Sequence, residues 1–155
     1  MGTWGSGLLE NDSAQDFLDE IAALDQRGRY ERISQLLNSV ADHPAVVMKQ
    51  LVPEEVIAAV VVVASSVLSN DTYEWATAVN DVNNGRLTLQ EAHGLAGVAL
   101  RALRSIVSDE HGWWTESWVT ESDRQHAGCQ IQEIISVLDR QATLASVNRI
   151  SLCDQ

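Results

Sequence analysis

The sequence predicts an all-α fold: a single-domain bundle of about five helices over residues 1–155, with an irregular glycine-rich hook at 1–12 and a tail at 145–155. Apolar residues recur at helical spacings of three and four along most of the chain, and helix-start signals precede several of these stretches. The length of 155 residues suits one domain with one core, and 45% hydrophobic residues exclude a disordered chain.

The first helix is expected to follow the hook and to end at, or be interrupted by, Gly28. Ser13 can cap this helix, with Asp16 in the first turn, where an acidic side chain suits the helix dipole. The apolar stripe of the helix recurs at i, i+4 and i+7 and consists of Phe17, Ile21 and Leu24.

A second amphipathic helix follows, and it ends near His43 because the residue before Pro44 avoids helical geometry. The next segment, residues 45–52, is either a short strand or an irregular crossing. The apolar residues of the second helix are Tyr30, Ile33, Leu36, Leu37 and Val40.

A third helix is predicted to start at Pro53, a residue favoured at the first helical position, with Glu54 and Glu55 in its first turn. The 13 residues from Val56 to Leu68 are apolar except for two serines, so we expect this helix at the centre of the bundle. Because valine is a weak helix former, a buried strand is the alternative. The run is too short to cross a bilayer, which takes roughly 20 residues.

A fourth helix is expected after the polar stretch Asn70–Leu87, which contains the turn Asn83-Asn84-Gly85. Thr88 and Glu91 have the spacing of a capping box, which starts a helix that runs to about Val107. The apolar residues of this helix are Leu95, Val98, Ala102, Leu103 and Ile106.

The last long helix is predicted from about Glu121 to Ala142, after a linker or short helix at Asp109–Thr120. Its apolar stripe consists of Ile131, Ile134, Ile135 and Leu138. Cys129 falls in this helix, where we expect a small buried side chain, and Cys153 lies near the end of the chain. The two cysteines have no metal-ligand spacing, so a reduced chain is expected.

The charge excludes several classes of partner. The chain has 22 Asp and Glu against 10 Lys and Arg, a net charge of −12, which argues against binding nucleic acid or an anionic membrane. The acids are concentrated in two blocks that lack lysine and arginine: six in residues 1–25 and five in residues 105–123. Such blocks are typical of a surface that attracts a basic protein.

The second acidic block also contains three tryptophans and is the predicted partner-binding site. Tryptophan anchors are common in protein–protein hot spots, and nearby acids steer a basic partner. The alternative, favoured for Trp113 and Trp118, is that these rings fill the core between helices. The predicted partner-binding residues are Asp109, Glu110, Trp113, Trp114, Glu116 and Trp118.

No nucleophile or nucleotide motif is present, so we expect no catalytic residue and no cofactor. The segment Asn80–Glu91 resembles a calcium-binding EF-hand loop, with Gly85 at the sixth position. Val82 at the third position offers no oxygen ligand for calcium, so a plain turn before a capped helix is favoured. The histidines match no zinc pattern, and a metal site at residues 109–111 with His93 or His126 is the alternative.

No secretory signal is expected, and a cytoplasmic location follows from this prediction. Residues 1–6 fit the myristoylation pattern with Gly2 as acceptor, but the first charges that follow are acidic and disfavour an anionic membrane.

The chain opens with Met1-Gly2-Thr3-Trp4-Gly5-Ser6-Gly7, continues with Leu8-Leu9-Glu10-Asn11-Asp12, and then has Ala14 and Asp16-Phe17. This opening resembles a bacterial family known as domain of unknown function 4259. Leu9 replaces the usual aromatic residue, residues 70–86 depart from the pattern, and residues 95–103, 108 and 114–116 are similar to the second half of the family. The resemblance implies a small bacterial cytosolic protein and supplies no catalytic residues.

The leading functional hypothesis is a non-catalytic immunity protein that neutralises a basic, nuclease-type toxin. The alternatives are a metal-dependent enzyme or metal-binding protein that uses the residues near 109–111, and a helical adaptor or self-associating subunit.

Overall fold

The computed structural model describes residues 12–42, 53–68, 73, 75, 89, 92–107 and 121–153. Within these ranges the chain forms five α-helices and one 3-10 helix and no strand, which confirms the predicted all-α bundle. The elements are α1 (Asp12–Ala23), α2 (Gln26–Asp42), α4 (Pro53–Val67), η2 (Ala92–Leu95), α6 (Ala96–Val107) and α8 (Glu121–Cys153).

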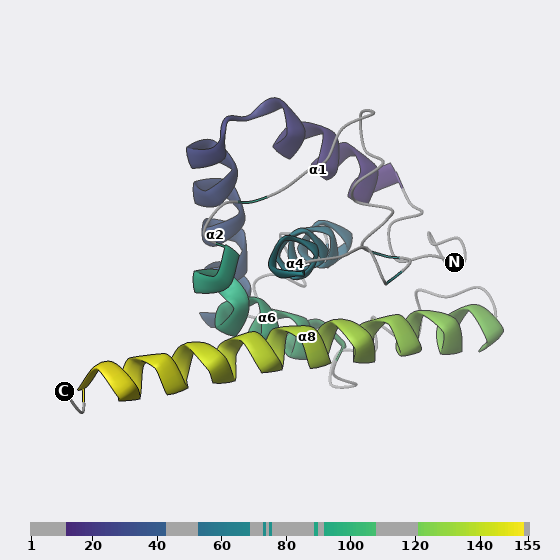
Figure 1. Ribbon diagram of the computed structural model, residues 1–155. Helices are drawn as coiled ribbons and strands as arrows, with labels where there is room; N and C mark the ends of the chain where they lie inside the picture. Colours follow the sequence, from purple (N-terminus) through teal and green to yellow (C-terminus); the bar gives the residue numbers. More distant parts are fainter. Residues whose placement is uncertain are drawn as a thin grey trace.

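Helix α4 occupies the centre of the bundle, as its sequence predicts. It packs against α1, α2, α6, η2 and α8, and Figure 1 views it end-on between them. All nine residues from Val56 to Ala64 are at most 1% exposed, because neighbouring helices cover α4 on several sides. The valines therefore form a helix and not the alternative strand, since the burial of every face outweighs a small difference in helix propensity.

The corner between α1 and α2 differs from the prediction. Helix α1 ends at Ala23, and Gly28 is the third residue of α2, so it neither ends nor interrupts α1. Asp25 caps α2: its Oδ1 accepts a hydrogen bond of 2.7 Å from the N–H of Gly28. A Cβ at position 28 would lie 3.0 Å from this oxygen, so glycine permits the close cap.

Two other predictions about α1 are wrong. Ser13 is already inside the helix, which begins at Asp12, and a residue inside a helix cannot be its N-cap. Leu24 is 36% exposed because α1 ends before it, so the helical stripe does not reach this position. The buried face of α1 consists of Ala14, Phe17, Leu18 and Ile21.

The predicted second and fourth helices are confirmed. In α2, Ile33, Leu36, Leu37 and Val40 are buried, and Tyr30 packs against the core. The predicted start of the fourth helix at Thr88 is wrong, because Leu89, the residue after Thr88, is not helical. The described helix begins at Ala92 as the 3-10 helix η2 and continues as α6, with all its predicted apolar residues buried. Ser66 of α4 helps to place this segment, because its Oγ accepts a hydrogen bond of 2.9 Å from the N–H of Leu89.

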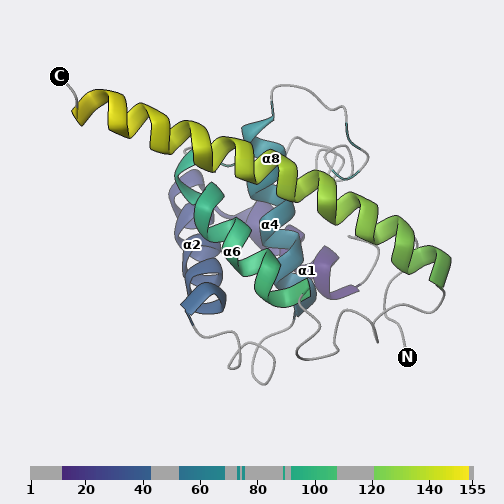
Figure 2. The same ribbon diagram turned by 90° about the horizontal axis from the view of Figure 1, so that it is seen from below.

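Helix α8 is longer than predicted and continues through most of the expected tail to Cys153. Residues 129–153 contain no glycine or proline, so no residue in this range interrupts the helix. Figure 2 shows α8 crossing α6 and α4 and then extending past the bundle at its C-terminal end. In the predicted stripe, Ile131, Ile134 and Leu138 are buried and Ile135 is partly buried.

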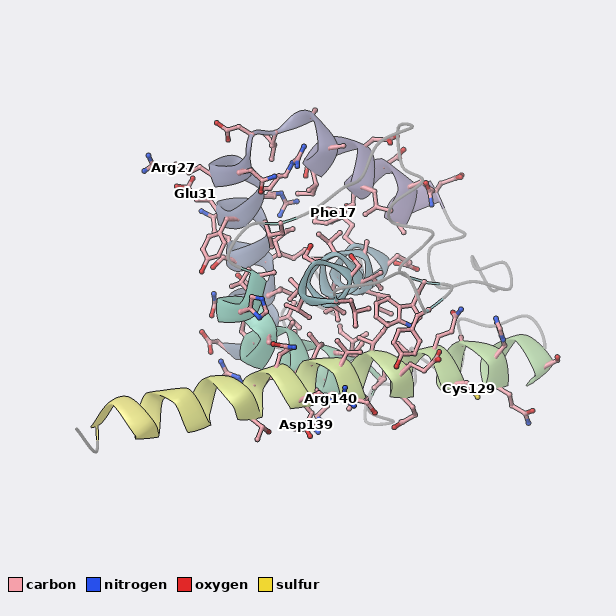
Figure 3. The ribbon with its side chains drawn as sticks, viewed as in Figure 1. Phe17, Arg27, Glu31, Cys129, Asp139 and Arg140 are labelled. Carbon is pink, nitrogen blue, oxygen red and sulfur yellow. The ribbon has the colours of Figure 1, made fainter. Side chains whose placement is uncertain are left out.

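Cys129 is exposed, so the prediction of a buried side chain is wrong. Its neighbours in the helix, Ala127, Gln130 and Ile131, are the residues of this turn that face the bundle. Figure 3 shows Cys129 and Asp139 on the side of α8 away from α4.

Candidate functional site

The predicted tryptophan-containing site lies outside the described residues, and so does His111. This applies to every predicted partner-binding residue: Asp109, Glu110, Trp113, Trp114, Glu116 and Trp118. Several other predicted segments also lie outside the described residues. They are residues 1–11 of the hook, residues 45–52, the capping box of Thr88 and Glu91, and the calcium candidate at 80–91 except for Leu89.

The two described histidines of the alternative metal site do not come together. His93 lies on η2, and its Nδ1 is 2.9 Å from Oε1 of Gln141 on α8. His126 lies 15 residues before Gln141 in the same helix, about 22 Å along the helix axis. In the ranges that the structure covers, no group of three or more His, Cys, Asp or Glu side chains is placed to hold a metal ion.

The described acids of the N-terminal block, except Asp25, lie on the solvent-facing side of α1. Six residues of this helix are exposed, four of them are acids and none is basic. The periodicity of the helix produces this side, because the positions between the acids turn inward to meet α4. The exposed residues of α1 are Asp12, Gln15, Asp16, Asp19, Glu20 and Ala23.

The three arginines of α2 determine how much of this acidity is neutralised. Arg27 pairs with Glu31 four residues later, at 3.2 Å, and Figure 3 shows both on the outer side of α2. Arg32 contacts α1, because its Nε lies 3.1 Å from Oε2 of Glu20 and its guanidinium lies 5.3 Å from the centre of the Phe17 ring.

Arg29 caps the C-terminal end of α1. Its Nε donates to the carbonyl of Ile21 and its Nη2 to the carbonyl of Ala22, both at 3.0 Å. These carbonyls lie in the last turn of the helix, where a cation suits the helix dipole, and the carbonyl of Ile21 also accepts a hydrogen bond of 3.1 Å from the N–H of Leu24. Arg29 therefore connects α1 to α2.

Asp12, Asp16 and Asp19 consequently form no ion pair within the described ranges, whereas Glu20 does. The three carboxylates lie at i, i+4 and i+7 and span about 10 Å along the helix. One DNA strand carries a phosphate about every 3.4 Å, so the density of negative charge on α1 is of the same order. We call Asp12, Asp16 and Asp19 the acidic stripe.

The acidity continues toward the first turn of α4. The pKa of Glu55 is raised above its ordinary value, mainly because partial burial removes water from its carboxyl. The positive charge of Arg32 opposes this shift in pKa, and the negative charges of Glu20 and Glu54 add to it. Glu55 therefore experiences the field of an acid on α1 as well as that of its neighbour on α4.

Within the described residues, the structure is a helical bundle with an acidic face on α1. Residues 2–128 match the family described as a domain of unknown function (DUF4259), so the chain belongs to this family. The match begins in the glycine-rich opening and ends in the second turn of α8. Neither the curated proteins nor the solved structures that were searched contain a match to this chain.

Sequence reasoning located the N-terminal acidic block but missed the residues that decide which of its charges remain. Arg29 and Arg32 act on α1 only because α2 folds back against it. The three arginines within six residues after an acidic helix were the available signal, and the spacing Asp25-x-x-Gly28 was the signal for the cap. Among the helices that the structure describes, none combines the length and the apolar composition that would span a membrane.

Proposed function

We propose that this protein is a non-catalytic immunity protein that binds a basic, nuclease-type toxin and occupies the cleft in which the toxin binds phosphate. The observation that carries the proposal is the acidic stripe of α1, whose three carboxylates form no ion pair within the described residues. A cleft built to bind phosphates presents basic side chains, and these attract a row of carboxylates of similar charge density.

The net charge of −12 supports the same proposal. Long-range attraction between an acidic and a basic protein accelerates association, which suits an inhibitor that must act before the toxin reaches nucleic acid. The second acidic block, with Trp113, Trp114 and Trp118, would supply the apolar anchor that charge alone does not provide. The proposed place of action is the bacterial cytoplasm.

The direct test is calorimetry with the product of a neighbouring gene for a basic toxin, together with an assay of its nuclease activity. We expect a one-to-one complex of micromolar affinity or tighter, which weakens as salt rises, and loss of nuclease activity at equal concentrations. No heat of binding in low salt would overturn the proposal.

Three matched variants locate the contact, because each removes three negative charges. Replacing the acidic stripe, Asp12→Asn/Asp16→Asn/Asp19→Asn, should weaken the complex by about 10- to 100-fold if each aspartate faces a basic side chain. The control variant changes acids far from α1 and should weaken it by about threefold or less; it is Asp42→Asn/Glu133→Gln/Asp139→Asn. Equal effects of these two variants would mean that total charge, and not this stripe, drives binding.

The third variant tests the predicted tryptophan-containing site. It is Asp109→Asn/Glu110→Gln/Glu116→Gln, and an additional Trp114→Ala variant tests the aromatic anchor. An effect larger than that of the control would place this segment in the interface, and an effect equal to that of the control would limit the interface to α1.

A further inference from the structure

The C-terminal end of α8 lies beyond the rest of the bundle. The helix has 33 residues, which corresponds to about 50 Å. Figures 1 and 2, which view the molecule from directions 90° apart, both show its last turns extending past the other helices. No other described element lies beside these turns, so within the described structure the bundle does not support them.

The composition of this end is that of a helix that packs against protein. Residues 144–153 include six apolar residues and one charged residue, Arg149. A ten-residue helix of this kind has little stability by itself in water, because most helical stability in proteins comes from packing of the apolar side chains. The six apolar residues are Leu144, Ala145, Val147, Ile150, Leu152 and Cys153.

The distribution of charge identifies the partner that α8 can approach. Residues 125–153 contain two acids, Glu133 and Asp139, and two bases, Arg140 and Arg149, so their net charge is zero. The remaining 20 acids and 8 bases carry the whole net charge of −12. Two copies of this chain repel each other over most of their surfaces, and the repulsion is smallest where α8 meets α8.

The position of α8 leaves the acidic stripe available. Helix α8 lies on one side of α4 and α1 lies on the opposite side (Figure 1). Contact between two copies through α8 therefore does not cover the acidic stripe. An antiparallel arrangement of the two helices keeps the acidic bundles furthest apart and pairs the helix dipoles favourably.

We propose that α8 is the self-association element of this protein, and that residues 144–153 of one copy pack against α8 of a second copy in an antiparallel, two-fold symmetric dimer. The symmetry explains how one segment without net charge, residues 125–153, can serve both partners, because a two-fold interface uses the same surface twice. The dimer carries two acidic stripes that face away from the shared interface.

The test is the mass of the full chain in solution, measured by light scattering and sedimentation velocity over a wide range of concentration in the presence of a reductant. We expect twice the monomer mass at high concentration, and a larger dimer fraction in about 0.5 M than in 0.05 M salt, because salt screens the repulsion between bundles. A monomer at every concentration and salt would overturn the proposal.

Matched variants locate the interface. Leu144→Asp/Ile150→Asp should abolish the dimer, because it places two uncompensated acids in the segment. Gln35→Glu/Ser39→Asp adds the same charge at two exposed positions of α2 and should leave the dimer intact. Circular dichroism verifies that both variants remain folded, and a chain that ends after Thr143 provides a second monomeric form.

The remaining outcomes also decide the question. A dimer that survives both the double substitution in α8 and the shortened chain would overturn the proposed interface, and so would equal loss of the dimer in the α2 variant. If the chain is a monomer and its binding to another protein depends on residues 144–153, the segment is a binding site for that protein, and the proposed dimer is wrong. Neutralising the acidic stripe should leave the dimer intact and slightly favour it, because it lowers the repulsion between bundles, so failure of the proposed function and failure of this inference can be distinguished.

Discussion

Helices α1 and α8 lie on opposite sides of α4, and they differ in charge. Four of the six exposed residues of α1 are acids, whereas residues 125–153 of α8 have no net charge. Both helices are nevertheless attached to α4 in the same way, through a buried apolar stripe. The comparison shows that burial attaches each helix to the bundle while the exposed residues set what each helix can contact.

The largest expected effect tests the similarity between the two helices. Leu18 on α1 and Leu138 on α8 are both fully buried, so we expect Leu18→Ala and Leu138→Ala each to lower the free energy of unfolding by about 2–5 kcal/mol. Urea denaturation measures both. A loss below about 1 kcal/mol for only one of them would mean that this helix is attached less firmly than the other.

A smaller effect is expected at the corner that belongs to α1 alone. Arg29→Ala removes the side chain that caps two carbonyls of α1, and it should cost about 1–3 kcal/mol of unfolding free energy, since hydrogen bonds from a charged donor are involved. The matched control is Arg27→Ala, which removes an exposed pair with Glu31 and should leave the denaturation midpoint almost unchanged. Equal effects of the two variants would contradict the assigned role of Arg29.

The cap of α2 is worth less. Asp25→Ala removes the acceptor for the N–H of Gly28 and should cost about 1 kcal/mol, whereas Asp25→Asn keeps an oxygen in place and should cost a few tenths. Thermal unfolding compares the two. If both variants were equally destabilised, the negative charge of Asp25, and not its hydrogen bond, would be the stabilising feature.

The smallest expected effect comes from Glu55. Burial raises the pKa of the Glu55 carboxyl in the native state above its pKa in the unfolded chain. The stability associated with the protonated carboxyl is therefore fully present below the unfolded pKa, and it is lost as pH rises through the native pKa and the carboxyl ionises. Glu55→Gln should therefore raise the denaturation midpoint slightly at pH 7 and leave it nearly unchanged at about pH 4.

The control for this prediction is Glu133→Gln, which removes the same charge from α8 at a distance from the corner. It shows what the loss of one negative charge does at a site away from Glu55. Denaturation curves of the two variants and the parent chain at both pH values provide the measurement, and a loss of stability in Glu55→Gln at pH 7 would contradict the prediction.

Prediction from sequence succeeded where many residues contribute to one signal. The run from Val56 to Leu68 predicted a central helix, and the stripes of α2, α6 and α8 predicted which of their residues are buried. It failed where one residue decides: Ser13 is the second residue of α1 and not its cap, and Gly28 lies five residues beyond the end of α1, because a helix boundary depends on a single cap. Cys129 was placed on the wrong side of α8 because its apolar character was considered without its position in the helix.

The sequence by itself determined the all-α fold, the central helix and the net charge of −12, because periodicity and composition are properties of the chain alone. Only the tertiary structure decided which acids remain unpaired and how far α8 extends beyond the bundle. The pair of Arg32 with Glu20 and the contacts of Arg29 with the end of α1 join residues 7 to 12 positions apart, on different helices. Such contacts depend on how the helices pack, and the packing in turn determines which charges and which surfaces remain available to a partner.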